Sequence, residues 1–327
     1  MNILITGGAG FIGSHIALKL YEKGHEVTII DDFSTGNNCF LENYKVIKCD
    51  INDFEKLKFK LSMEKFDLLF HLASKSILTE SYDKYQKYYL TNVNGTENIM
   101  KLCNKLKIQK VIFSSSASVY GNLYSRPIKE CDLTNPSNPY GSTKLKAEEL
   151  IKDLGKEYNI DSIIFRFFNA CGGDPKLRIG ENHNPETHLI PSLIRNSLSK
   201  KKESFEVFGN KFNTNDGFAI RDYLNVMDIC SAFIKGMFWL LNNRGHNIFN
   251  LGSNKGFSVK QIINECEIVI NKNINYKIKP HRKGEPDYLL SDISKATNIL
   301  KWKPRYSSIS EIIKTSYLWQ SKIFKDE

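Results

Sequence analysis

Two residues four apart in the segment YGSTK, Tyr140 and Lys144, form a candidate acid/base pair. A tyrosine hydroxyl can exchange a proton with a substrate hydroxyl, and a nearby ammonium group favours the phenolate. The residues that follow, KLKAEELIKDL, are typical of a helix, in which residues four apart lie on one face. Tyr44 and Lys48 have the same spacing, but YKVIKCDI is typical of a strand, where four residues span roughly 13 Å. We therefore take Tyr140 and Lys144 as candidate catalytic residues.

A glycine-rich loop near the N-terminus could bring a dinucleotide beside this pair. Residues 2–6 are apolar and strand-like, GGAGFIG follows, and SHIALKLYEKG is helical in pattern. Glycines let the backbone approach a pyrophosphate, whose charge then lies against the N–H groups of the helix start. The candidate cofactor contacts in this loop are Gly7, Gly10, Phe11, Ile12 and Gly13.

The next expected strand, HEVTIID, ends at Asp31, about 20 residues past the loop. A carboxylate at this place can accept hydrogen bonds from both ribose hydroxyls of an adenosine. Residues 32–40 contain no arginine that could bind a 2′-phosphate. The pattern therefore favours NAD over NADP.

Two further strands are expected to end at the same edge of the sheet. YKVIKCD leads to Asp50 and Ile51, which are placed to contact an adenine, although an aspartate after a strand is often only a helix cap. FDLLFHLAS places His71 at that edge, and we favour a buried, hydrogen-bonded core histidine.

One long helix is expected from Tyr82 to Leu106, and its Asn92 is a further candidate cofactor contact. KVIFSSSASVYG then forms a strand that ends in serines, of which Ser116 and Ser118 are candidate catalytic residues. Short hydroxyls at a strand end can bind a sugar hydroxyl, and they are also common in turns. With DSIIFRFFN as a sixth strand, strands and helices alternate, which predicts a doubly wound parallel α/β sheet of the Rossmann type.

The chain changes character after residue 169. CGGDPKLRIGENHNPETH is a long polar segment, for which we expect a substrate-binding role. Later segments predict a smaller α/β domain, in which Ser258 with Gln261 and Ser308 with Glu311 have capping-box spacing. We expect residues 1–176 to form the NAD-binding domain, with a return segment near 222–246, and residues 177–327 to form the interleaved substrate-binding domain.

Composition excludes several other classes of protein. Of the 327 residues, 41% are hydrophobic, enough for a large core, and no apolar stretch is long enough to span a membrane. The net charge is +10, but the lysines are evenly spread and their longest run is only 200–202, so we expect no nucleic-acid partner. The seven cysteines show no CxxC spacing, and the N-terminus shows no signal-peptide pattern. We therefore expect a cytoplasmic protein without a metal site.

Together, TGGAGFIGSH, SSSASVYG and YGSTK resemble the extended short-chain dehydrogenase/reductase family. RIGENHNPETHLIP, VFGNKFNTNDGFAIRDYLNV, NLGSNKGFSV and HRKGEPDYLLSD are similar in order and spacing to its UDP-glucose 4-epimerase branch, so the resemblance covers nearly the whole chain. It implies interconversion of UDP-glucose and UDP-galactose through a 4-keto sugar, with NAD kept bound, in an enzyme that is commonly a homodimer. Nucleotide-sugar 4,6-dehydratases carry an Asp-Glu pair where Ala117 and Ser118 stand, so dehydration is not expected.

The resemblance also implies roles for the candidate catalytic residues. Tyr140 would be the phenolate base for the sugar 4-hydroxyl, and Lys144 would hold the nicotinamide ribose. Lys144 and the positive nicotinamide ring would both lower the pKa of Tyr140 from its usual ~10. Ser116 and Ser118 would hydrogen-bond the reacting oxygen.

Substrate contacts follow from the same resemblance. Arg221 would bind phosphate, although an ion pair with Asp222 is an alternative, and Leu289 matches the position that limits sugar size. Glu285 stands where an aspartate is usual, and either Lys75 or Ser76 takes the place of a lysine near the cofactor. The implied UDP-sugar contacts are Asn169, Leu189, Phe208, Arg221, Tyr223, Arg282, Glu285 and Leu289. The alternatives are a UDP-N-acetylglucosamine or UDP-glucuronate 4-epimerase and, from another class, a non-enzymatic NAD-sensing protein.

Overall fold

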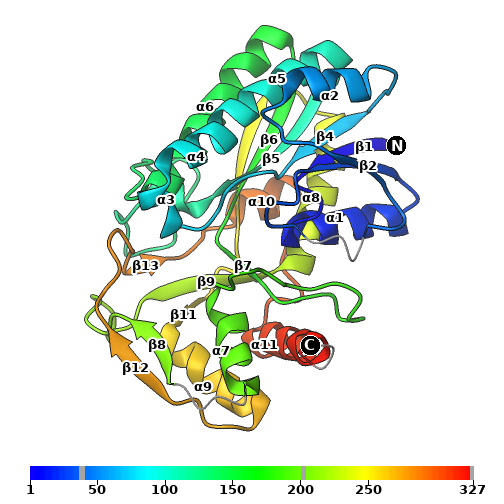
Figure 1. The fold of residues 1–327 in the computed structure, drawn as a ribbon. Helices are drawn as coiled ribbons and strands as arrows, with labels where there is room; N and C mark the ends of the chain where they lie inside the picture. The colour runs from blue at the N-terminus through cyan, green and yellow to red at the C-terminus, as the bar shows by residue number, and fades with distance from the viewer. Residues whose placement is uncertain (37–40, 200–203, 325–327) are drawn as a thin grey trace.

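A seven-stranded parallel sheet forms the larger part of the molecule in the computed structural model, which describes residues 1–36, 41–199 and 204–324 (Figure 1). The strand order is β10-β6-β5-β4-β1-β2-β3. The strands are β1 (Asn2–Thr6), β2 (Glu26–Asp31), β3 (Lys45–Lys48), β4 (Leu68–His71), β5 (Lys110–Ser116), β6 (Asp161–Phe167) and β10 (His246–Leu251). The expected doubly wound α/β fold is confirmed. The lysine run 200–202 and residues 37–40 lie outside the described residues.

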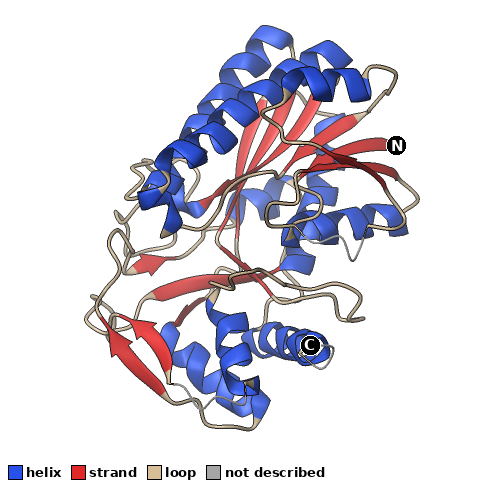
Figure 2. Ribbon diagram, viewed as in Figure 1, coloured by secondary structure: helices blue, strands red, loops and turns tan. Residues whose placement is uncertain are grey.

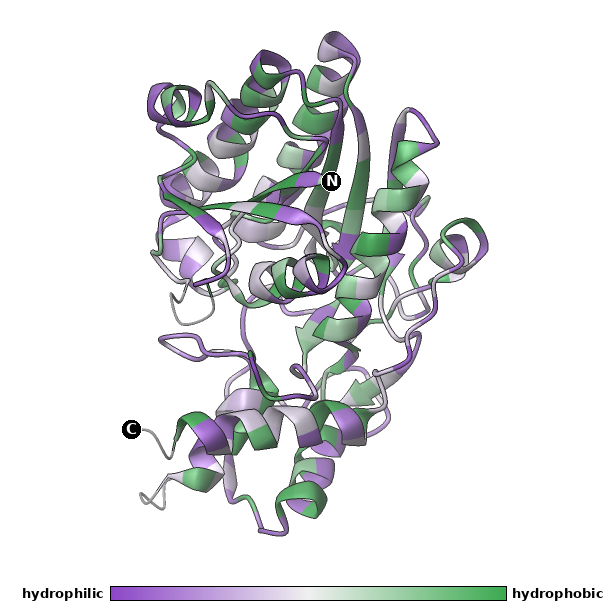
Figure 3. Ribbon diagram, turned by 90° about the vertical axis from the view of Figure 1, so that its right-hand side faces the viewer, coloured by the Kyte–Doolittle hydropathy of each residue, from purple (hydrophilic) through white to green (hydrophobic). Residues whose placement is uncertain are grey.

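Helices cover both faces of this sheet because the buried strands are apolar on both sides. One face packs on α1 (Phe11–Glu22) and α8 (Val226–Leu241), around side chains such as Ile16 and Phe233. The other face packs on α2 (Phe54–Leu61), α5 (Gly95–Leu106) and α6 (Pro139–Tyr158). Figure 2 shows these two helical layers on either side of the strands, and in Figure 3 the helices alternate hydrophobic and hydrophilic segments, as amphipathic helices do.

A smaller part lies beyond the carboxyl ends of these strands (Figure 1). Its four-stranded sheet has β9 (Ile220–Asn225) beside β7 (Asn169–Cys171), β11 (Gly256–Ser258) and β13 (Tyr288–Leu289), and β8 (Phe205–Phe208) pairs with β12 (Tyr276–Lys279). Its helices α7 (Leu189–Leu198), α9 (Val259–Ile270) and α11 (Ile309–Ile323) share an apolar core, while α10 (Ser294–Ile299) packs beside β10. Ser258 and Gln261 form the expected capping box, and Ser308 accepts a hydrogen bond from the Glu311 N–H.

The single helix expected from Tyr82 to Leu106 is wrong. The chain forms α3 (Glu80–Asp83), α4 (Tyr85–Tyr89), a π-helical turn (Leu90–Asn94) and then α5. Lys84 interrupts the first two at φ −120° and ψ 37°. The wide π turn carries Asn92, whose amide binds the backbone of Lys75 on both its N–H and C=O, so local helix geometry yields to this contact.

Candidate functional site

The glycine loop joins β1 to α1 at the carboxyl edge of the large sheet. Gly7 has φ +73°, and a Cβ there would lie 2.5 Å from the backbone nitrogen of Ala73. A Cβ on Gly13 would lie 2.1 Å from the carbonyl oxygen of Gly7. Only glycine fits at these two positions, so the loop can bring bare backbone N–H groups up to a phosphate.

Asp31 ends β2 beside this loop. Its carboxylate accepts hydrogen bonds from the N–H groups of Ala9 and Phe33, both at 2.9 Å. Burial raises the pKa of Asp31, and these two backbone hydrogen bonds oppose that shift. A carboxylate has about four acceptor sites, so two remain for ribose hydroxyls.

Lys75 lies next to Asp31, and Ser76 is exposed. The Lys75 ammonium group donates to the Ser34 hydroxyl at 2.6 Å, beyond the end of β2. Of the two residues, Lys75 is therefore the one whose side chain extends over the carboxyl edge of the sheet near Asp31, where the cofactor is expected. Among the described residues 32–36, the chain carries no arginine that would favour a 2′-phosphate.

Asp50 and Ile51 follow β3, as the sequence predicts. Asp50 is exposed and closes a turn by accepting from the N–H and the side-chain amide of Asn52, both at 2.9 Å. The alternative role of Asp50 as a helix cap is wrong, because Asp53 caps α2. Ile51 is buried against Gly95, where it packs in the core.

His71 is the buried core histidine that we favoured. Its two ring nitrogens lie 2.7 Å from the Thr6 hydroxyl and 2.9 Å from the Thr96 hydroxyl. Burial lowers the pKa of His71 to about 3, and the nearby Lys144 charge adds to the shift. The imidazole is therefore neutral near pH 7 and helps to fix the sheet edge.

Asn92 links this edge to the helix that carries the catalytic pair. Its amide donates to the Lys75 carbonyl at 3.0 Å and to the Thr143 hydroxyl at 3.0 Å. Both amide hydrogens are thus used within the protein. Asn92 is therefore suited to positioning α6, on which Thr143 precedes Lys144.

Tyr140 lies in the first turn of α6 and faces the end of β5. The Asn138 side chain caps this helix through the N–H of Gly141. Ser116 lies near enough to Tyr140 to affect its pKa, and the Ser116 hydroxyl accepts a hydrogen bond from the N–H of Ser118 at 3.1 Å. The structure therefore brings together the tyrosine and the serines that the sequence singled out.

Lys144 lies beneath this pair and is 2% exposed. Its ammonium group donates to the Ser114 carbonyl at 2.7 Å and lies 4.7 Å from the centre of the Phe113 ring. Burial lowers the pKa of Lys144 to about 7, against the opposing charge of Glu148. The other pair of equal spacing does not converge, since Tyr44 packs on Tyr21 and Lys48 lies over Phe33.

The expected fall in the pKa of Tyr140 is wrong for the chain alone. Burial raises the pKa of Tyr140 to about 12, and only the hydrogen bond with Ser116 opposes it. The physical reason is desolvation, which disfavours the phenolate more than this one hydrogen bond favours it. A positive group bound next to Tyr140 would be needed to reverse the shift.

Arg221 and Asp222 point to opposite faces of β9, so their expected alternative ion pair is wrong. Arg221 instead lies 3.2 Å from Glu285, and burial lowers its pKa. Asp222 accepts from the backbone and hydroxyl groups of Ser253 and Ser291. The second carboxylate oxygen of Glu285 is buried without a hydrogen-bond partner among the described residues.

Phe208 and Arg282 also come together. The Arg282 guanidinium lies 3.9 Å from the centre of the Phe208 ring, close enough to stack on it. A flat aromatic group and a permanent cation thus meet at the end of β8, which suits a base next to phosphates.

The other candidate substrate contacts lie around these. Leu289 pairs with Arg221 in the small sheet and packs with Phe168 and Ala117. Asn169 pairs with Tyr223, whose ring packs in the apolar core and whose pKa burial raises. Leu189 begins α7 and is half-buried.

Sequence patterns missed a closing contact between the two parts. The Tyr82 hydroxyl lies 3.3 Å from the Ser137 carbonyl and 3.2 Å from the Lys283 carbonyl, and Ser137 donates to the Gly284 carbonyl at 2.9 Å. These bonds run from side chains to loop backbone, which leaves no periodic signal in the sequence.

Known proteins share this arrangement over the full chain. A family model described as GDP-mannose 4,6 dehydratase matches residues 4–315. The UDP-glucose 4-epimerase of Halalkalibacterium halodurans is 38% identical over 98% of this chain and 96% of its own length. The chain belongs to the UDP-glucose 4-epimerase family. A crystal structure of a UDP-glucose 4-epimerase has a TM-score of 0.94 at 37% identity, covering 98% of each chain. The Stenotrophomonas maltophila UDP-glucose-4-epimerase, solved with NAD and formylated UDP-arabinopyranose, has a TM-score of 0.94 at 29% identity and covers all of both chains.

The residues at positions 117 and 118 distinguish this chain from a 4,6-dehydratase, the enzyme after which the matching family model is described. Expulsion of water from a sugar needs an acid/base pair beyond the tyrosine, which the sequence comparison placed at positions 117 and 118. Here Ala117 is buried and apolar, and Ser118 is an alcohol. Neither side chain offers the carboxylic acid that the dehydratases carry there.

Proposed function

We propose that this isomerase interconverts UDP-glucose and UDP-galactose by reversible oxidation at sugar C4, with NAD held throughout. The observation that carries the proposal is the convergence of Tyr140, Ser116 and the buried Lys144 at the carboxyl edge of the sheet, where the glycine loop also lies. Ligands bind at this edge in doubly wound folds.

The residues present fit NAD. Gly7 and Gly13 leave backbone room that any Cβ would fill, and Asp31 keeps acceptor sites free beside them. When bound, NAD would accept a hydride from C4 and return it to the opposite face of the ketone. The UDP-glucose-4-epimerase of Stenotrophomonas maltophila is described with bound NAD, which supports this choice.

Tyr140 takes the proton of the 4-hydroxyl in the proposed mechanism. Ser116 lies beside Tyr140 and would bind the same sugar oxygen, so the proton could pass along two hydroxyls. Lys144 lies buried below them and would bind the nicotinamide ribose. The positive charge of the bound cofactor opposes the burial that raises the pKa of Tyr140 in the chain alone.

Arg221, Arg282 and Glu285 are proposed to hold UDP. Two guanidinium groups suit a pyrophosphate, because each offers planar, permanently charged donors. The unpaired oxygen of Glu285 is an acceptor for a ribose hydroxyl, which supports the contact although the residue is longer than the usual aspartate. Phe208 and Leu189 are proposed to contact the uracil. Asn169 and Tyr223, at the neighbouring strand ends, are proposed as further contacts to the UDP-sugar.

Leu289 leaves the identity of the hexose open to a second candidate. It is buried and intermediate in size, which also suits UDP-N-acetylglucosamine or a uronic UDP-sugar. Turnover of UDP-galactose and of UDP-N-acetylgalactosamine by the purified protein, with no NAD added, tests the proposal. Activity on the acetylated sugar would show a wider specificity, and a non-enzymatic NAD sensor would turn over neither substrate. We expect UDP-glucose to form, and activity on neither UDP-galactose nor UDP-N-acetylgalactosamine would overturn the assignment.

The assembly and organisation of the chain are also proposals. Exposed Tyr85, Tyr89 and Leu90 lie together on α4 and the π turn, a surface that a second copy of the chain could cover in a homodimer. The return segment near 222–246 is supported by α8, which packs on the large sheet, and β10, the edge strand of that sheet, continues it to Leu251. Six of the seven cysteines are described and free, which supports the cytoplasm as the compartment. No helix in the described part of the chain could cross a membrane.

A further inference from the structure

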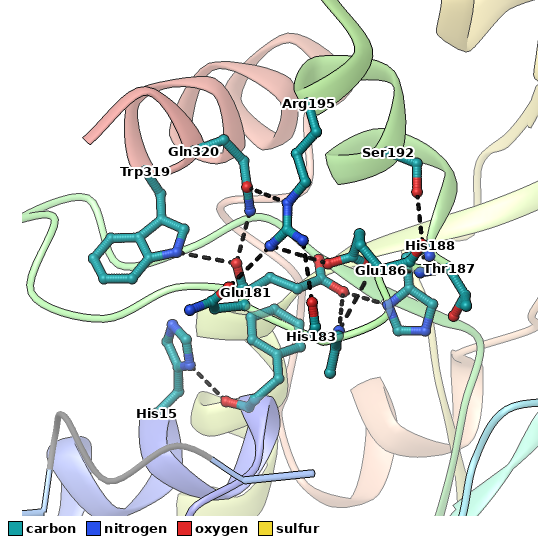
Figure 4. Close-up of polar contacts among 12 residues, drawn as sticks. His15, Glu181, His183, Glu186, Thr187, His188, Ser192, Arg195, Trp319 and Gln320 are labelled. Carbon is teal, nitrogen blue, oxygen red and sulfur yellow. Dashed lines mark hydrogen bonds and ion pairs between the residues drawn. The ribbon is translucent and has the colours of Figure 1, made fainter. Parts of the chain in front are cut away.

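A cluster of two histidines and two glutamates lies in the segment before α7, outside the site described above. Glu181, His183, Glu186 and His188 each offer one donor atom, and these four atoms lie within 4.8 Å of one another (Figure 4). The segment reads ExHxxExH, a spacing with neither helical nor strand periodicity. The loop itself therefore brings these side chains together.

We propose that these four residues form a structural zinc site. Zinc in proteins binds histidine nitrogen and carboxylate oxygen at about 2.0–2.2 Å in a tetrahedron, which places neighbouring donors roughly 3.3–3.5 Å apart. The Nδ1 atom of His183 lies 3.3 Å from Glu181 and 3.6 Å from Glu186. His188 Nδ1 contacts the same oxygen of Glu181. The types and the number of donors match a closed four-ligand site, and His188, which now hydrogen-bonds Glu181, would have to move apart from it to bind the ion.

One buried oxygen in the cluster points independently to a missing ligand. Glu181 is 2% exposed, and its Oε2 atom has no hydrogen-bond partner among the described residues. A buried carboxylate oxygen without a partner is costly, and a bound cation removes that cost. The hydrogen bonds among the four residues therefore do not account for the burial of this oxygen.

Neighbouring elements hold the ligands in place, as metal sites require. The Glu181 carbonyl accepts from Trp319 Nε1 at 3.0 Å and from Gln320 Nε2 at 2.7 Å, both on α11. Arg195 on α7 donates to the His183 carbonyl at 3.1 Å and lies 3.7 Å from the outer oxygen of Glu186. The backbone around the four donors is thus fixed before any ion binds.

The charge of the cluster suits one divalent ion. Two carboxylates with two neutral imidazoles carry a net charge of −2, which one Zn²⁺ would neutralise.

The position of the cluster suggests what the metal would do. The His183 ring lies 6.2 Å from the Phe11 ring of the glycine loop, and Leu189, a candidate uracil contact, directly follows His188. All four positions around the ion would be filled by protein, so no site remains for substrate. The zinc would hold the segment before Leu189 in one conformation, with the His183 ring against Phe11 of the glycine loop.

Metal analysis of the full-length, tag-free protein tests the proposal. The protein is equilibrated with zinc chloride, dialysed against metal-free buffer and analysed by mass spectrometry, beside His188→Gln and the control His25→Gln, whose histidine lies away from the cluster. We expect about one zinc per chain in the parent and control, and a loss of at least ~10-fold in His188→Gln. His188 is half-exposed, so this variant should fold.

Cobalt provides a second readout that needs no variant. Co²⁺ added to the chelator-treated parent should give the intense visible absorption bands of a tetrahedral site, and zinc chloride should abolish these bands. Zinc chloride should also raise the Tm of the protein above that of the chelator-treated parent. A zinc content below one tenth per chain in the parent would overturn the proposal, as would zinc retained in full by His188→Gln. A metal-free parent whose Tm falls on the His188→Gln substitution would assign the cluster to a charge network instead.

Discussion

The edge of the large sheet and the smaller part above it hold their polar side chains by different means. At the sheet edge, His71, Asn92 and Lys144 are buried and bind hydroxyl groups or backbone carbonyls at strand and helix ends. In the smaller part, Arg221 binds Glu285, 64 residues away in the sequence, and Arg282 stacks on Phe208. At the sheet edge the polar side chains are already held in place by the protein. In the smaller part the charged side chains pair or stack with other side chains, contacts that a charged ligand could replace.

The largest effect should follow from removing the buried ammonium group. Lys144→Met should lower kcat by about 10²–10⁴-fold, because the site loses the buried amine that is proposed to hold the nicotinamide ribose beside Tyr140. Steady-state turnover of UDP-galactose measures it, with the exposed Lys146→Met as the control. A fall of less than tenfold would show that the edge does not depend on Lys144.

A charged pair in the smaller part should affect binding more than chemistry. Arg221→Leu should raise KM about 10–100-fold with little change in kcat, since one charge-assisted contact to phosphate is worth about 1.5–3 kcal/mol. Arg221→Lys should recover part of the loss, because it keeps the charge without the planar fork. A loss confined to kcat would place Arg221 in the chemical step and remove the distinction between the two regions.

Sugar size should respond more weakly to Leu289. Leu289→Ala should increase the ratio of kcat/KM for UDP-N-acetylgalactosamine over UDP-galactose by about tenfold, the usual effect of apolar pocket volume. Paired assays with the two substrates give this ratio directly. An unchanged ratio would mean that Leu289 does not limit the pocket.

The smallest effect near neutral pH concerns His71. Its pKa is about 3 in the folded chain and 6.5 in the unfolded chain, so below pH 6.5 the unfolded state binds more protons. This difference favours unfolding progressively as the pH falls from 6.5 towards 3, and has no effect above pH 6.5. Urea unfolding should show a slope of up to about 1.4 kcal/mol per pH unit from this residue, and His71→Gln should lack that contribution. An identical slope in both proteins would contradict a neutral, buried imidazole.

The features that could be predicted from the sequence are those that depend on residue periodicity and on which residues end the strands. Apolar runs located the parallel strands, and the spacing from Tyr140 to Lys144 on a helix placed both groups at the sheet edge. The helix expected from Tyr82 to Leu106 is broken because Asn92 binds the Lys75 backbone, a long-range contact that local propensity does not contain. Desolvation of Tyr140 likewise depends on everything packed around it, so the sequence did not predict that burial raises the pKa of Tyr140 in the chain alone.

Charge contacts across loops were the hardest to predict. The sequence offered Asp222 as the neighbour of Arg221, but strand alternation sends the two side chains to opposite faces. The cluster from Glu181 to His188 was missed because it forms in an irregular loop, which leaves no periodic signal, and α7 and α11 support the backbone of that loop. Only the family resemblance pointed to Arg282 and Glu285, since no local pattern relates them to β8 and β9.

The central claim is that Tyr140 is the base of an epimerase whose cofactor stays bound, and Tyr140→Phe tests it most directly. The substitution removes one hydroxyl and keeps the ring that packs in the site. Turnover of UDP-galactose and the NAD content of the purified protein should be measured on the same sample. The account predicts a loss of at least ~10³-fold in kcat with NAD still bound. Turnover close to that of the parent, with NAD retained, would contradict it.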